Sequence, residues 1–174
     1  MPSPIAHLSA GCLIGRKAKL GLWEMFAVLA LSQLPDLDSI PGILFGDFGK
    51  YHNNLTHSIF FCVAASAVVG MAVSMFWKGK GKRWFLLSLI ASSLHLLMDL
   101  FTTGRGQMLF WPITSARFKP PFQFFYGLQW SKGLFSISHL WTTLNEVAVI
   151  LVVVLVYVLL KRRGSIKNPE GVEQ

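Results

Sequence analysis

Residues 54–77 form an apolar run that contains no Lys, Arg, Asp or Glu. A helix rises about 1.5 Å per residue, so this run would span about 36 Å, enough to cross a hydrocarbon core of about 30 Å. Residues 83–102 and 143–160 form two more long apolar runs. Because lipid cannot satisfy free peptide groups, we expect all three runs to be membrane-spanning helices.

The composition indicates the same class of protein. Hydrophobic residues make up 53% of the 174 residues, charged residues make up 14%, and the mean hydropathy is +0.52. Soluble domains carry about 25% charged residues, so this chain has too little charge to cover a water-soluble globule. The net charge of +8 does not indicate a nucleic-acid partner, because Lys and Arg flank the apolar runs and form no single interleaved patch.

Two shorter apolar segments precede the long runs. Residues 20–34 include Glu24 and predict either a tilted span or a helix shielded by the others. Residues 4–15 are too short to cross alone and lack the basic start of a signal peptide, so we expect a retained, re-entrant helix. The predicted fold is an all-α polytopic membrane bundle, with about four spans plus this short N-terminal helix. Residues 1–160 would form one membrane-embedded domain, and residues 161–174 a polar cytoplasmic tail.

The Lys and Arg residues are shared unequally between the two sides of this bundle. Eleven lie at the ends near residues 16–19, 78–83 and 161–167, and five lie on the other side. Cytoplasmic loops carry the excess of Lys and Arg in membrane proteins. We therefore predict a multi-pass protein of the cell membrane whose C-terminus is cytoplasmic, and whose connection at 103–141 faces outward.

The ionisable residues that remain are concentrated on the outward side. Asp99 lies 16 residues from Arg83, or about 24 Å along a helix, and Glu146 lies a similar distance from Lys161. Carboxylates and imidazoles gathered at one level would be unsatisfied without a cation, and a divalent metal binds both. The mixed set favours zinc, with manganese or iron as alternatives, over calcium or magnesium. The outward set comprises Asp36, Asp38, Asp47, Asp99, Glu146, His7, His52, His57, His95 and His139.

Three short motifs carry most of these groups. His95-Leu-Leu-Met-Asp99 places an imidazole and a carboxylate on one helix face, where both reach one ion or form a simple hydrogen-bonded pair. Pro-Asp-Leu-Asp at 35–38 offers two carboxylates, which are either metal ligands or helix-capping acids. His-Asn-Asn-Leu-Thr-His-Ser at 52–58 opens the first long run, where its histidines are ligands or ordinary residues of a helix start.

The order of these motifs resembles that of the YdjM/YbcI-like family of membrane-bound, predicted metal-dependent hydrolases. The resemblance covers residues 1–112 well, and Glu146 also fits it. The family usually has Arg after the first histidine of its third motif, where this chain has Asn53. The family is in turn similar to the zinc phospholipase C fold, in which several helices supply ligands to a metal cluster. The matching features are His7, Pro-Asp-Leu-Asp at 35–38, His-x-x-x-Thr-His-Ser at 52–58, His-x-x-x-Asp at 95–99 and Trp-Pro at 111–112.

The resemblance implies a role for each residue of a cluster of one or two ions. His57, His95 and Asp99 would share one metal, and Asp36 or Asp38 would bridge it to a second. His52 would be a ligand or would support one. The implied ligands are His7, Asp36, Asp38, His57, His95, Asp99 and Glu146, and the implied catalytic residues are Asp36, Asp38 and His52.

The predicted activity is hydrolysis of a phosphoester bond in a phospholipid or lipid-linked phosphate, with Asp36 or Asp38 accepting the proton. The 103–141 connection holds ten aromatic residues, four Lys or Arg and no acid, which suits anchoring at the headgroup level. It also suits a lid whose Arg105, Arg117 or Lys119 binds a lipid phosphate. The alternatives are a structural metal site, a lipid-handling or transport protein, and helix packing without metal. The sequence does not predict the oligomeric state.

Overall fold

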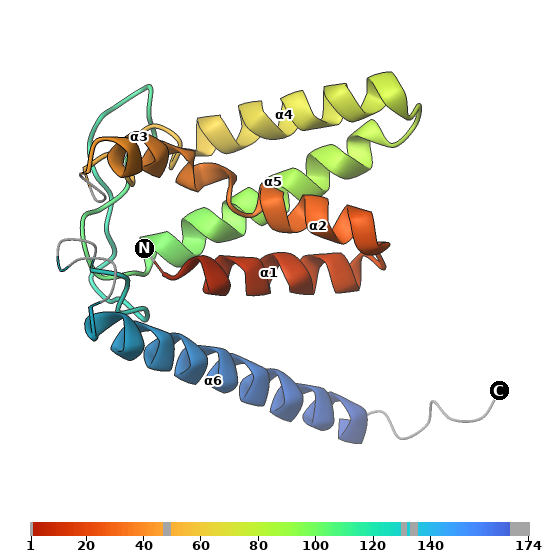
Figure 1. The fold of residues 1–174 in the computed structure, drawn as a ribbon. Coiled ribbons are helices and arrows are strands. Elements are labelled where there is room, and N and C mark those ends of the chain that lie inside the picture. The colour runs from red at the N-terminus through yellow and green to blue at the C-terminus, as the bar shows by residue number, and fades with distance from the viewer. Residues whose placement is uncertain (1, 47–49, 130–131, 133–135, 168–174) are drawn as a thin grey trace.

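All the long elements of the structure are helices, as the sequence predicts. The structure is a computed structural model, and it describes residues 2–46, 50–129, 132 and 136–167. Residues 101–137 connect α5 to α6 and contain two isolated β-bridges. The elements in chain order are α1 (Pro4–Lys17), α2 (Leu22–Leu31), the 3₁₀ helix η1 (Leu34–Asp38), α3 (Ser39–Leu44), α4 (Ile59–Phe76), α5 (Gly81–Leu100) and α6 (Ser138–Lys167) (Figure 1).

Three of these helices are long and apolar enough to cross a membrane: Ile59–Phe76, Gly81–Leu100 and Ser138–Leu160. They correspond to the three long apolar runs. The expected fourth span is α2, whose 10 residues cover only about 15 Å, half of a hydrocarbon core. The helix ends at Leu31 because Pro35 follows, and the chain then turns through η1.

The last helix extends beyond its apolar run. α6 continues to Lys167, so the first residues of the predicted polar tail are helical. Residues 168–174 of that tail lie outside the described residues.

Small residues bring α4 and α5 close together. A Cβ atom on Gly70 would lie 2.9 Å from Phe85 Cβ, and one on Gly81 would lie 2.7 Å from the Gly70 carbonyl oxygen. Ser66 donates a hydrogen bond to Ser88 across the same contact, at 3.2 Å. Such close packing of small and hydroxyl residues is typical of helix pairs in membranes, where lipid provides no hydrophobic drive for association.

The α1–α2 hairpin packs on the other side of α5. Val28, Leu87 and Ala91 form the buried apolar core of this contact. At one end, Arg83 Nη2 donates to the Ala18 carbonyl at 3.1 Å. Because α1 and α5 lie alongside each other from this point, the first turns of α1 reach the last turns of α5. The N-terminus, η1, α3 and the 101–137 connection gather at that end of the molecule (Figure 1).

The last helix, α6, diverges from α1 toward its C-terminal end (Figure 1). Its first two turns hold the connection in place: Thr142 Oγ1 donates to the Gly127 carbonyl at 2.8 Å, and Asn145 Oδ1 accepts from Tyr126 N at 2.7 Å. Beyond these turns the described side chains of α6 are largely exposed. In a bilayer they would contact lipid.

Candidate metal centre

Four chain segments deliver seven ionisable side chains to one buried cluster, which we call the His/Asp centre. His7 comes from the first turn of α1, and the two aspartates come from η1. Two histidines precede α4, and the His-x-x-x-Asp pair lies in the last turns of α5. The centre therefore contains every sequence-predicted metal ligand except Glu146. Its members are His7, Asp36, Asp38, His52, His57, His95 and Asp99.

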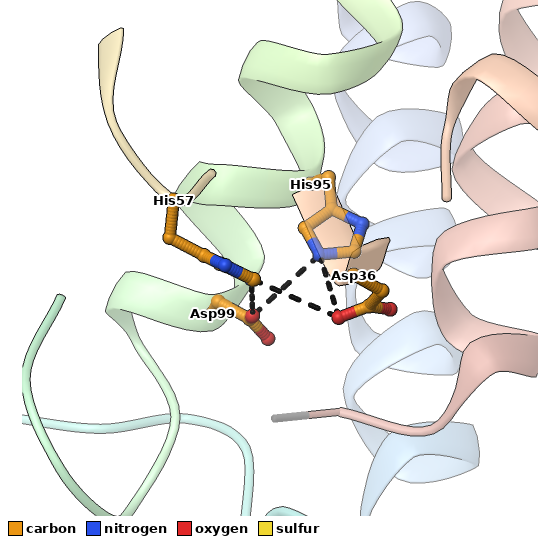
Figure 2. Close-up of side chains that lie close together, drawn as sticks. All are labelled: Asp36, His57, His95 and Asp99. Atoms are coloured by element: carbon orange, nitrogen blue, oxygen red, sulfur yellow. Dashed lines mark hydrogen bonds and ion pairs between the residues drawn. The ribbon is translucent and has the colours of Figure 1, made fainter. Parts of the chain in front are cut away.

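Four of these side chains point their ligand atoms toward one position (Figure 2). His57 Nε2 lies 3.0 Å from Asp99 Oδ2 and 3.7 Å from Asp36 Oδ1. His95 Nε2 lies 3.6 Å from the same Asp99 oxygen and 3.5 Å from the same Asp36 oxygen. The structure thus brings together the three residues that the resemblance implies share one metal, together with Asp36, one of the two aspartates implied to bridge it.

Three of these separations, at 3.5–3.7 Å, are long for hydrogen bonds, whereas His57 Nε2 and Asp99 Oδ2 are hydrogen-bonded at 3.0 Å. Zinc bonds of about 2.0–2.1 Å in tetrahedral geometry place neighbouring ligand atoms about 3.3–3.4 Å apart. The four observed separations lie on either side of that value. Within the described part of the chain, His95 Nε2 and Asp36 Oδ1 are buried and make no hydrogen bond. Buried polar atoms are normally paired, so these atoms fit a ligand role.

Hydrogen bonds on the far side of each imidazole prepare the histidines to bind a metal. His95 Nδ1 lies 2.7 Å from the Ser32 carbonyl oxygen, which can only accept, so Nδ1 carries a proton. His57 Nδ1 lies 3.0 Å from Asp38 Oδ2 in the same way. In the neutral imidazole this leaves a lone pair on each Nε2, the atom that faces the four-ligand set. Metal-binding histidines typically have such a carbonyl or carboxylate partner.

Asp38 is ionised in this setting. Burial alone would raise the pKa of its carboxyl group, but the contacts with His52 and His57 outweigh burial and lower the pKa below its ordinary value. Its Oδ2 atom also accepts from the backbone N–H of Asn54 at 3.0 Å. Asp38 Oδ2 is therefore used in orienting His57, while Oδ1 faces His52 Nδ1 at 3.5 Å.

The remaining members surround Asp99 on its other sides. His7 Nε2 lies 3.5 Å from Asp99 Oδ1, and its ring stacks on that of His95 with 3.7 Å between centroids. His52 Nε2 lies 3.3 Å from Asp99 Oδ2. Asp38, His52 and His57 form a second group with metal-ligand spacing. Asp99 thus contacts all four histidines of the centre, which no single motif of the sequence indicates.

Glu146 does not take the place that the resemblance implies. Its two carboxylate oxygens accept hydrogen bonds from the backbone N–H and the hydroxyl of Ser3, each at 2.5 Å. Of the described residues, those grouped at metal-ligand spacing include neither Glu146 nor His139. Glu146 instead holds the start of α1, and with it His7, beside α5. Distance along the sequence gives the predicted depth of a residue, but it does not say which side of α6 Glu146 occupies.

The three basic residues predicted to bind a lipid phosphate contact the protein's own backbone. Arg105 and Arg117 donate to carbonyl oxygens of residues 50–53 and 104–106, at 2.6–3.0 Å. Lys119 Nζ donates to another carbonyl of the second segment at 2.7 Å. Arg105 and Arg117 therefore join the 101–137 connection to the segment that carries His52, and Lys119 bonds within the connection itself. Phosphate binding by these three residues stays a prediction.

Two further residues support the centre, and the sequence predicted no such role for either of them. Thr56 Oγ1 donates to the Pro35 carbonyl at 2.6 Å, which ties the His-x-x-x-Thr-His-Ser motif to Pro-Asp-Leu-Asp. Asn53 has a backbone φ of 62°, a conformation that Asn tolerates better than most residues, and its side chain donates to the Arg105 carbonyl at 3.1 Å. The position of Thr56 between two histidines was the available signal.

The fold and the centre define a multi-pass membrane protein with a buried His/Asp group that could hold metal. A family model described as YdjM inner membrane protein matches residues 3–165. The chain belongs to this family, which confirms the resemblance seen in its motifs. The inner membrane protein YbcI of Escherichia coli (strain K12) is 34% identical over 143 residues, which cover 71% of this chain and 75% of that protein. No solved structure matches the chain.

Proposed function

We propose that this protein is a membrane-bound, metal-dependent hydrolase that cleaves a phosphoester bond of a phospholipid or lipid-linked phosphate. The observation that carries the proposal is a surplus of buried ligands. A single four-coordinate ion is satisfied by Asp36, His57, His95 and Asp99, yet three more ionisable side chains adjoin them. Such a surplus favours two ions, zinc first and manganese or iron as alternatives.

The surplus members have donor atoms available. Within the described residues, buried His7 Nε2, Asp38 Oδ1 and His52 Nε2 make no hydrogen bond. A pair of ions held by these residues would supply Lewis acidity and a water of lowered pKa. Asp99 would be shared between the two positions, since its oxygens face His7 on one side and three other histidines on the other.

Asp36 is placed to accept a proton during hydrolysis. Its side chain is 14% exposed, whereas those of His57, His95 and Asp99 are 0% exposed. One carboxylate oxygen faces the four-ligand set, and the other points away from it (Figure 2). Substrate would therefore approach on the side of η1. Asp38 is less suited to this catalytic role because one of its oxygens already binds Asn54 and His57.

The membrane location follows from the relative and from the charge distribution. The relative from Escherichia coli is called an inner membrane protein, and we propose the same membrane for this chain. The excess of Lys and Arg near residues 16–19, 78–83 and 161–167 would place those ends in the cytoplasm. The His/Asp centre would then open toward the outer leaflet.

A structural metal site is the second candidate. The four-ligand set could by itself complete a tetrahedral shell, and structural zinc sites are closed in this way. Such an ion would stabilise the joint between η1, α4 and α5 without activating water. The two candidates differ in the number of ions and in turnover.

Metal analysis of detergent-purified protein, paired with phosphate or headgroup release from phospholipid vesicles, separates them. We expect close to two ions per chain and turnover in the wild type, and loss of both in Asp99→Ala. His139→Ala is the matched control, because His139 belongs to neither group at metal-ligand spacing among the described residues. One ion per chain with no turnover on any phospholipid would establish the structural role instead. Full activity of Asp99→Ala would refute the hydrolase.

A further inference from the structure

An apolar groove of about 960 Å³ runs between α2 and α4. Ala27 and Ala30 line it from α2, and Val69 and Val73 line it from α4. Trp84 of α5 contributes as well. Both α2 and α4 pack on α5, so the groove is the space left between two helices that share a common neighbour.

The groove lies at the depth of the membrane hydrocarbon. Val69 and Val73 belong to the spanning helix Ile59–Phe76. Among the lining residues, charged or amide side chains occur at the two ends: Glu24 and Lys80 at one and Gln33 at the other. A polar ligand would find few partners along the middle. Hydrocarbon would fill this space, because an empty groove forfeits dispersion contacts.

One end of the groove lies against η1, the short helix that carries two aspartates of the His/Asp centre. Leu34 and Leu37 line the groove, and both belong to η1, the turn that carries Asp36. Asp36 is also the one member of the four-ligand set whose side chain is partly exposed. The groove and the open side of the centre therefore meet at the same short helix.

We propose that the groove receives one hydrocarbon chain of a glycerophospholipid whose phosphate group is presented at Asp36. The inference rests on the proposed hydrolase function and names its substrate class. The acyl chain of the lipid would extend from η1 along α2 toward Trp23, and the residues from Trp23 to Leu31 alone cover about 12 Å. This acyl chain would bind away from the bond that is cleaved and would hold the head group in position.

The proposal predicts that substrate preference depends on chain length. A long-chain lipid fills the groove, whereas a short-chain, water-soluble analogue with the same head group leaves most of it without a ligand. The metal ligands are the same for both substrates. The long-chain lipid should therefore have a higher kcat/KM than the short-chain analogue. This preference should vanish when a large side chain fills the groove.

The first test is photo-crosslinking of the full-length protein in phospholipid vesicles. The probe is phosphatidylglycerol with a diazirine on one long acyl chain. Adducts on residues 27–37 and 69–73 are measured relative to adducts on residues 150–156, whose side chains are exposed on α6 away from the groove. We expect the ratio to fall by about tenfold in Ala27→Trp and Ala30→Trp, which place an indole in the groove. Ala64→Trp makes the same type of change on an exposed part of α4, outside the residues that line the groove, and should leave the ratio unchanged.

The crosslinking result does not depend on turnover. In Asp99→Asn we expect the ratio to stay near that of the wild type, because Asp99 does not line the groove. Equal ratios in the wild type, Ala27→Trp and Ala30→Trp would overturn the proposal. Thermal melting in detergent shows that these variants are folded, and Ala30→Trp decides the outcome if Ala27→Trp does not fold.

The second test compares turnover of dioleoyl- and dihexanoyl-phosphatidylglycerol. We expect Ala27→Trp to lower kcat/KM about tenfold for the long-chain lipid and to leave the short-chain lipid unaffected. Equal losses on both substrates, or none on either, would overturn the groove as a substrate site while leaving the hydrolase intact. Groove crosslinking without any turnover would instead refute the hydrolase and retain lipid binding.

Discussion

Replacing Asp38 with Asn tests whether hydrogen bonds outside the four-ligand set control metal affinity. Asp38 Oδ2 accepts from His57 Nδ1 and from Asn54 N, each at 3.0 Å. An amide oxygen also has two lone pairs, so it can keep both contacts while the negative charge is lost. The substitution therefore changes the electrostatics of His57 with little change in its position.

The expected magnitude follows from this difference. A hydrogen bond to a charged group contributes about 1.5–3 kcal/mol, and a neutral one about 0.5–1.5 kcal/mol. Partners of metal-binding histidines typically change metal affinity by about 10- to 100-fold. We therefore expect Asp38→Asn to raise the Kd for zinc about tenfold or somewhat more. Asp99→Asn should have a much larger effect, because Asp99 itself belongs to the four-ligand set.

Zinc competition against a fluorescent chelator, with purified protein in detergent, measures these affinities. Glu24→Gln is the matched control, since it makes the same acid-to-amide change beside Lys80, at the groove end away from the His/Asp centre. An unchanged Kd in Asp38→Asn would refute the orienting role of Asp38. A loss as large as that of Asp99→Asn would show that Asp38 is itself a ligand.

Three further predictions concern the structure around the centre. Glu146→Gln should lower the free energy of unfolding by about 1–3 kcal/mol without lowering the number of bound metal ions, because Glu146 binds Ser3. Loss of metal at an unchanged melting temperature would instead show that Glu146 is a metal ligand. Gly81→Leu should destabilise the α4–α5 pair by about 1–3 kcal/mol or more, since a Cβ atom there approaches the Gly70 carbonyl. Ala64→Leu, at an exposed position of α4, is the control. Equal melting temperatures of the two variants would contradict this packing. Removing metal with a chelator should lower the melting temperature, and added zinc should restore it. An ion that binds only the folded state stabilises it by about 4 kcal/mol when its concentration is a thousandfold above Kd. An unchanged melting temperature would argue against a bound ion.

Much of the fold could be predicted because lipid leaves so few options. The three long apolar runs had to be helices, and each became one. The His95–Asp99 pair could be predicted for a similar reason, since residues four apart share a helix face regardless of the rest of the fold. The exception is α2, where the hydropathy of residues 20–34 did not reveal that the helix would end at Leu31.

What the sequence by itself determined was the helices and which acidic and histidine residues were candidates for the buried centre. Only the tertiary structure decided which of those residues meet. Distance along a helix gives depth, but rotation about the helix axis and the partner on each side come from packing. That is why His7 lies against His95, Glu146 binds Ser3, and Arg117 contacts the Asn53 carbonyl. The groove between α2 and α4 likewise exists only because both helices pack on α5.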